Sequence, residues 1–198
     1  MKKYLCSLFF FIISLSIVYG CEKQVLPVPV YPLDVTTVTE ALKEAELSWT
    51  ITEEEPLTKG QIMYTLHDKD DKLVAFILSG ILNERRLLDI SFMPYSDNPT
   101  ITQFLPEEEW ERAIVFATLL YGGFESKHQV YDCFTSDYDT KNTVTVPREK
   151  IVGNGEVSTW QSEINDIYCL VRTEWPYVSM PQRYLNTVRF DNTNGGHL

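Results

Sequence analysis

The chain has 198 residues, enough for one domain, and its 28 acidic and 17 basic residues give a formal net charge of −11 at pH 7. An acidic surface repels the phosphates of nucleic acids and the headgroups of anionic lipids, which excludes both as partners bound through charge. The acidity otherwise favours solubility and identifies no partner.

The first twenty residues have the pattern of a secretory signal peptide. Lys2 and Lys3 provide a positive start, and the sixteen residues 4–19 carry no charge. This stretch is shorter than the roughly 20 apolar residues that a helix needs to cross a bilayer. Gly20 then supplies a small residue before the cleavage site. We therefore expect residues 1–20 to be removed, and we leave them out of the fold prediction.

The residue that follows is Cys21. The sequence Val18-Tyr19-Gly20-Cys21 resembles the lipobox of bacterial lipoprotein precursors, although the bulky Tyr19 departs from that pattern. The resemblance covers residues 1–21 and implies that Cys21 becomes the N-terminus and carries diacylglycerol and fatty acid such as palmitate. Several acyl chains hold a protein stably at a membrane, here the extracytoplasmic face of the cell membrane. A plain signal peptide before an ordinary cysteine, or an uncleaved anchor helix, is the alternative.

Residues 21–34 are predicted to be the lipidated cysteine and a proline-rich tether. Pro27, Pro29 and Pro32 favour extended, polyproline-like backbone. At about 3 Å per residue, this tether would lift the domain some tens of ångströms from the membrane. Alternatively, residues 25–31 add an edge strand, where proline is tolerated. Without residues 1–20 the chain keeps 15 basic and 28 acidic residues, a net charge of −13.

The remaining residues, 35–198, are predicted to form a single domain that begins with a helix. Thr37 and Glu40 match a capping box, and apolar residues recur at helical spacing as far as residue 47. Alternating apolar and polar residues then predict four strands, near residues 49–51, 62–67, 73–78 and 87–92.

The second half again begins with helices. Pro106 and three glutamates favour a helix start, and Gly122-Gly123 a helix end. Ser126 can cap a short helix that carries Val130 and Phe134. Residues 140–154 read as a loop within which 144–146 and 151–152 could pair. Strands are predicted at 157–160, 167–171 and 184–190.

This order of elements predicts an α+β fold, an antiparallel β-sheet with helices packed on one face. Each half of the chain contains helix followed by strands, so two tandem helix-plus-strands units are compatible with it. That layout is similar to the layout of beta-lactamase-inhibitor-like proteins, as an analogy of arrangement alone. A single sheet fits equally well, because the two halves share no residue-level repeat.

Two cysteines remain after Cys6 leaves with the signal peptide and Cys21 is lipidated. Cys133 and Cys169 are a candidate disulfide, because the envelope permits such bonds. The bond would close a 36-residue loop, worth about 3–4 kcal/mol in the chain-entropy model. Alternatively, both are buried thiols that act as small apolar side chains.

No catalytic or metal-binding signature is present in the sequence. His67, His128 and His197 lack the spacing of a helical metal pair, and neither a nucleophile elbow nor a Walker loop occurs. Residues 137–142 weakly match a calcium loop, but without its glycine and its bidentate glutamate. We therefore predict no cofactor and no metal site.

Aromatic residues concentrate near the C-terminal strands, and they provide the candidate binding face. Trp160, Trp175 and Tyr177 offer amphipathic ring area of the kind found in binding interfaces. Trp175 and Tyr177 are expected to be the most exposed, because residues 174–178 read as a loop. Alternatively, these rings form the core and rim of the sheet.

The sequence thus predicts a membrane-anchored surface lipoprotein that acts as a non-catalytic binding or accessory module for an envelope protein or a glycan. The alternative is a cell-envelope hydrolase that uses carboxylates. A deep pocket holding two carboxyl groups of raised pKa would indicate the hydrolase. A shallow aromatic face around Trp175 would indicate the binding module.

Overall fold

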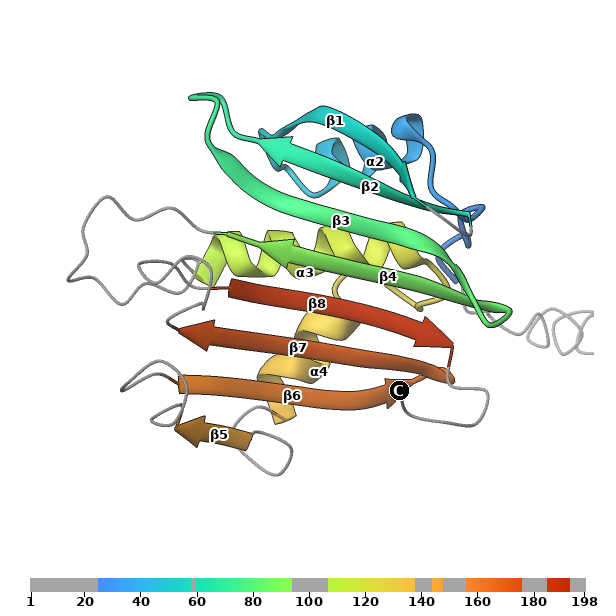
Figure 1. Cartoon of the computed structure of the whole chain (residues 1–198). Helices are drawn as coiled ribbons and strands as arrows, with labels where there is room; N and C mark the ends of the chain where they lie inside the picture. Colours follow the sequence, from blue (N-terminus) through green and yellow to red (C-terminus); the bar gives the residue numbers. More distant parts are fainter. Residues whose placement is uncertain are drawn as a thin grey trace, which may run out of the picture.

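The computed structural model describes residues 25–57, 60–93, 107–137, 144–147, 156–175 and 185–192. These residues form one antiparallel sheet of eight strands, with three helices packed on one face (Figure 1). The elements in chain order are α2 (Val35–Glu44), β1 (Thr50–Leu57), β2 (Gln61–His67), β3 (Leu73–Leu82), β4 (Arg85–Phe92), α3 (Glu107–Tyr121), α4 (Gln129–Asp137), β5 (Val144–Pro147), β6 (Glu156–Ile164), β7 (Ile167–Trp175) and β8 (Leu185–Asn192). The predicted α+β fold class is confirmed.

The strand order, β1-β2-β3-β4-β8-β7-β6-β5, combines the two arrangements that the sequence left open. Strands β1 to β4 form one meander and β5 to β8 another, and their last strands, β4 and β8, pair with each other. At this junction Leu88 pairs with Phe190 and Ile90 with Val188, and all four side chains are fully buried. Two units of similar layout therefore share one sheet and one core.

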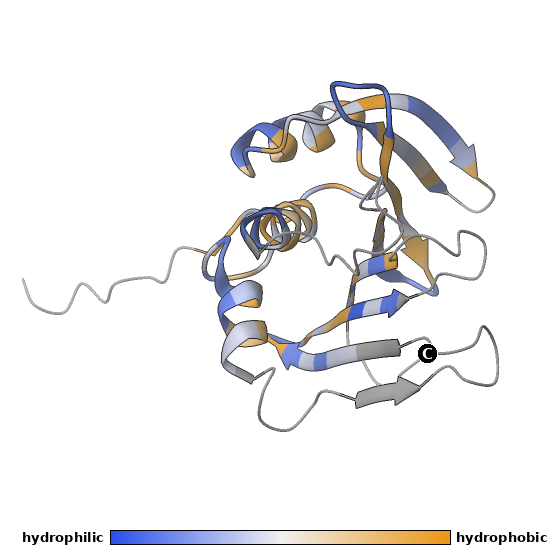
Figure 2. Cartoon of the chain, turned by 90° about the vertical axis from the view of Figure 1, so that its left-hand side faces the viewer, coloured by the Kyte–Doolittle hydropathy of each residue, from blue (hydrophilic) through white to orange (hydrophobic). Residues whose placement is uncertain are grey.

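Side chains alternate between the two faces of the sheet, as its pleat requires. On β4, Leu88, Ile90 and Phe92 are fully buried in the core, whereas Asp89 and Ser91 between them point to the opposite face. Figure 2 shows the helices together on one side of the sheet. From α3, Ala113 and Ala117 are fully buried, and side chains this small allow the helix axis to approach the strands closely.

Two strand ends differ from the prediction. Residues 53–55, three glutamates that lie between the strands predicted near 49–51 and 62–67, belong to β1, where Glu54 pairs with Tyr64 of β2. This strand lies at the edge of the sheet, where charged side chains reach solvent and are well tolerated. Glu174 and Trp175 also belong to a strand, because Glu174 pairs with both β6 and β8 and Trp175 pairs with β6. The predicted loop at these two residues is therefore wrong.

The N-cap of helix α2 lies three residues before Thr37, the N-cap of the predicted capping box. Asp34 is the N-cap, with extended backbone and a side-chain Oδ1 that accepts a hydrogen bond of 2.7 Å from the Thr37 N–H. Thr37 therefore lies in the first turn of the helix. Aspartate binds the unpaired N–H groups of a helix start as well as threonine does, so the capping-box pattern alone did not decide between the two starts.

The segment before α2, residues 25–33, is packed against the domain, and we call it the strap. The Leu26 N–H donates to the Phe124 carbonyl at 2.7 Å, and the Gly123 N–H donates to the Leu26 carbonyl at 3.0 Å. Further along, the hydroxyl of Tyr31 donates to the carbonyl of Leu120 at 3.1 Å. The prediction of a spacer is therefore wrong for residues 25–33, because these hydrogen bonds hold them against the domain.

The end of the strap is part of the core. Leu33 is fully buried, its N–H donates to Ser79 Oγ at 3.2 Å, and its carbonyl accepts from the Tyr64 hydroxyl at 2.7 Å. Arg86 lies over the rings of Tyr31 and Tyr121, at 5.6 and 4.2 Å from their centroids. Because these partners come from β2, β3, β4 and α3, the strap ties the N-terminal segment to both halves of the molecule.

Candidate functional site: a charged cleft between the helices

A cleft of about 220 Å³ opens on the helix side of the molecule. Its walls are the end of α2, the first half of α3 and the turn before α4. Ala45 and Val115, each 3% exposed, provide apolar lining, and the other lining residues are charged or titratable. These are Glu44, Glu46, Glu108, Glu111, Arg112, Lys127 and His128.

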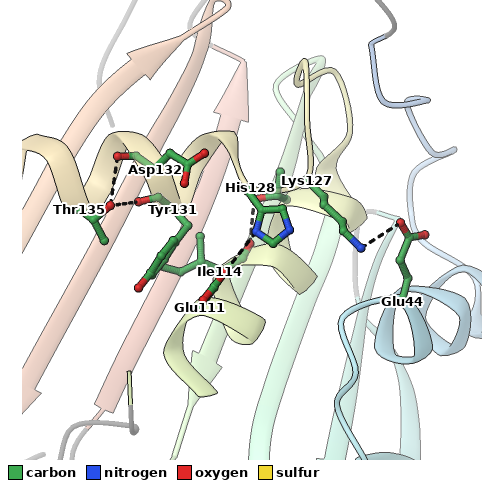
Figure 3. A network of polar contacts seen from close by, with 9 residues as sticks. Glu44, Glu111, Ile114, Lys127, His128, Tyr131, Asp132 and Thr135 are labelled. Carbon is green, nitrogen blue, oxygen red and sulfur yellow. Dashed lines mark hydrogen bonds and ion pairs between the residues drawn. The ribbon is translucent and has the colours of Figure 1, made fainter. Parts of the chain in front are cut away.

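Two ion pairs cross the cleft region, and Figure 3 shows their side chains pointing toward each other. Lys127 Nζ lies 3.8 Å from Glu44 Oε1, which joins the turn before α4 to α2. His128 Nδ1 lies 3.3 Å from Glu111 Oε1 of α3, a pair that is ionic when the histidine is protonated. All four side chains are more than a third exposed, so solvent weakens both pairs and each adds little to stability. Their charges therefore remain accessible to a ligand.

The turn that carries Lys127 and His128 is held by local hydrogen bonds. The Glu125 N–H donates to Gln129 Oε1 at 2.7 Å, and the Asp132 N–H donates to the His128 carbonyl at 2.9 Å. In α4, the hydroxyl of Thr135 donates to the Tyr131 and Asp132 carbonyls (Figure 3). The two basic side chains consequently project from a defined backbone position.

The residues that line the cleft have a net negative charge. Four glutamates face Arg112, Lys127 and His128, which leaves a net charge of −1 with the histidine protonated and −2 with it neutral. None of the described lining residues is aromatic. Such a surface suits a cationic or amide-rich group, and it offers no ring on which a sugar could stack.

Among the described residues, two carboxyl groups have a raised pKa, and the fold keeps them apart. Burial raises the pKa of Asp89, against the opposing effect of Arg189, which is its partner across the β4–β8 junction. Burial also raises the pKa of Glu109, in the first turn of α3, with Arg112 opposing it. Asp89 points away from the face on which the helices pack, so these two groups do not form the carboxylate pair that a hydrolase would need.

Of the three residues in the predicted aromatic face, the structure describes the side chain of Trp160. Trp160 is fully buried, with its ring edge-to-face against Phe134 at 5.7 Å between centroids, so its place on an exposed face is wrong. Trp175 ends β7, where the backbone but not the side chain is described. Tyr177 lies outside the described residues, and so do Cys21 and the weak calcium-loop match after Asp137. For Trp160, the alternative of a core position is the one that the structure shows.

Cys133 and Cys169 are thiols, not a disulfide, in this structure. Cys169, on β7, is fully buried, and Cys133, on α4, is partly exposed. Burial raises the pKa of the Cys169 thiol, and the nearby Cys133 adds to the effect. The fold thus brings the predicted pair into one neighbourhood without the bond.

The sequence did not single out the cleft. From the sequence, His128 was considered only as a metal ligand, and it lies in the turn before α4. Neither Glu44 nor Glu111 is near Lys127 or His128 in the sequence, and only the packing of α2, α3 and α4 brings them together. The described residues hold no group of three or more histidine, cysteine or acidic residues fit to bind a metal ion.

Within the described part of the chain, none of the helices has both the length and the apolar character needed to cross a bilayer. Comparisons with protein-family models, with curated proteins and with solved structures found no match to this chain.

Proposed function

We propose that this chain is a lipid-anchored, non-catalytic binding module on the extracytoplasmic face of a bacterial cell membrane. The observation that carries the proposal is the position of Cys21 directly after Gly20, which ends the uncharged stretch that follows Lys2 and Lys3. That arrangement is what export and lipid attachment require, and the diacylated cysteine would hold a water-soluble acidic body at the membrane.

The binding surface that we propose is the charged cleft. Its volume of about 220 Å³ is smaller than the 300–1,000 Å³ typical of small-molecule sites, so it suits one side chain of a larger partner. Its four glutamates and its lack of described aromatic residues favour a lysine or arginine of an envelope protein over a glycan. The hydrolase alternative gains no support from Asp89 and Glu109, which lie on different sides of the sheet.

Lipid attachment is tested by metabolic labelling with a clickable fatty-acid analogue. We expect label on the wild-type protein and none on Cys21→Ala, with an intact mass that places the modification on the N-terminal cysteine. An unmodified cysteine, or a mature chain that begins elsewhere, would refute the anchor.

The cleft is tested by reversal of its charge. Glu108→Lys with Glu111→Lys should weaken capture of the envelope partner about tenfold or more, because cationic groups would then be repelled. Asp70→Lys with Asp71→Lys, in the exposed turn between β2 and β3, changes the net charge equally and should leave capture unchanged. Trp175→Ala with Tyr177→Ala tests the aromatic face in parallel. Loss of binding in that variant alone would move the site away from the cleft.

A further inference from the structure

Among the residues that the structure describes, the large exposed apolar side chains gather on the strap and beside it. Val25 is 50% exposed, Val28 53%, Val30 86% and Val35, at the start of α2, 45%. These four valines lie within eleven residues of the chain. In the described residues, the one other large apolar side chain with comparable exposure is Ile81, at 38%.

Ile81 belongs to the same end of the molecule as the strap. It pairs with Arg86 across β3 and β4, and Arg86 lies over the ring of Tyr31. In Figure 1 the start of the described chain, in blue, lies near the turn between β3 and β4. The four valines and Ile81 together are called the strap surface below.

The valines of the strap cannot point into the core. Leu26, Tyr31 and Leu33 already occupy the inward positions, and hydrogen bonds to Phe124, Leu120 and Ser79 hold the backbone. Contact behind the strap is also tight: a Cβ on Gly122 would lie 2.2 Å from the Pro27 carbonyl oxygen. The valines therefore stay on the outside of a fixed segment, where apolar groups cost free energy in water.

The strap begins a short distance along the chain from the proposed lipid anchor at Cys21. Val25 is the fourth residue after Cys21, and four residue steps span at most about 14 Å when the chain is fully extended. Acyl chains on Cys21 would thus hold the strap end of the domain at the level of the lipid headgroups.

We propose that the strap surface rests on the bilayer that holds the lipid anchor and so gives the domain one fixed orientation. This inference rests on the proposed lipid attachment. The apolar contact supplies attraction that the acidic domain lacks by charge. Glu108, in the cleft, precedes Tyr121 beside the strap by thirteen residues of α3, or about 20 Å of helix. The orientation therefore leaves the cleft on the side of the molecule that a partner can reach.

The test uses the full-length lipidated protein in vesicles of zwitterionic phosphatidylcholine. A genetically encoded, environment-sensitive fluorescent residue replaces Val30, and in a matched control it replaces Asp70, an exposed residue of the turn between β2 and β3. A fraction of the lipid carries a nitroxide quencher at the headgroup. We expect several-fold stronger quenching at position 30 than at position 70, with a blue-shifted emission at position 30 alone.

The outcomes separate this inference from the proposed function. Equal quenching at the two positions, in protein whose mass shows acylated Cys21, would overturn the orientation and leave the anchor intact. Protein that lacks acylation and does not bind vesicles would refute the proposed function instead. A blue shift at position 30 that appears without lipid and grows with protein concentration would assign the strap surface to a second copy of the chain, which also overturns the inference.

Discussion

At the scale of single residues, Gly122 and Cys169 depend most directly on contacts that are distant in the sequence. Gly122 has a φ of +69° and lies against the strap. The helix stop predicted at Gly122-Gly123 is present, but the absence of a side chain at Gly122 also lets the strap approach. Cys169, on β7, is fully buried, and Cys133 of α4 lies near it.

Gly122→Ala should destabilise the fold more than Gly60→Ala. Both glycines have a left-handed φ, +69° and +71°, so alanine at either costs about 1–2 kcal/mol in backbone strain. Only the Cβ at residue 122 meets the strap, whereas nothing lies within 4 Å of a Cβ at residue 60. Urea unfolding of the two variants measures the difference, and equal losses would show that the strap does not pack as described.

In the folded protein Cys169 should react with iodoacetamide far more slowly than Cys133. Its thiol is fully buried and burial raises its pKa, so very little reactive thiolate forms at neutral pH. Peptide mass spectrometry after timed alkylation checks this, with the urea-unfolded chain as the control in which both thiols react. Protection of both cysteines until a reductant is added would establish the disulfide predicted from the sequence.

At the scale of elements, the start of α2 links the strap to the helix layer. Asp34 caps the helix directly after the buried Leu33, and the lowered pKa of Asp34 comes mainly from the hydrogen bond donated by the Thr37 N–H. A carboxyl group whose pKa is lowered by folding stabilises the folded state above its unfolded pKa of about 3.9. That contribution is lost as the pH falls through the folded pKa.

Asp34→Asn should remove this pH dependence while keeping the cap. Asparagine caps helices about as well as aspartate does, but it does not titrate. The difference in unfolding free energy between wild type and variant should be constant above about pH 5 and shrink below about pH 4. Urea titrations between pH 6 and pH 2.5 measure it. A difference in unfolding free energy that grows as the pH falls would contradict the lowered pKa of Asp34. The pKa of Asp68 is also lowered, but Asp68 is present in both proteins, so its effect cancels in the difference.

At the scale of the whole molecule, the two meanders meet at β4 and β8 under one helix layer. Helix α3 belongs to the second half of the chain, but it contacts β4 of the first half as well as β8. The buried residues of both halves form one continuous cluster. Neither half can therefore bury its apolar face alone, although each has a complete meander.

We accordingly expect the two halves to unfold in a single transition. Far-ultraviolet circular dichroism and tryptophan fluorescence should give superimposable urea curves. Phe190→Ala, at the junction, should lower the unfolding free energy by about 3–5 kcal/mol and shift both curves together. A separately expressed fragment of residues 25–93 should lack cooperative unfolding. Two resolved transitions would instead show independent units.

Local features were largely predictable from the sequence, because they depend on periodicity and on turn residues. The turn between β3 and β4 uses Asn83 at φ +51°, and the turn between β6 and β7 uses Asn165 at φ +53°, a conformation that asparagine tolerates. Between such turns, the alternation of apolar and polar residues predicted each strand. The α+β class followed from the order of these elements, and the helix stop followed from Gly122-Gly123, which adopt left-handed backbone.

The pairing of β4 with β8, the docking of the strap, the burial of Trp160 and the charged cleft were decided by tertiary structure alone. Local patterns record which way a side chain must point relative to its own backbone. They do not record which distant surface will cover it. The folded state is stabilised when apolar faces from remote parts of the chain pack together. The proline-rich segment that was read as a spacer packs against the domain in this way through Leu33.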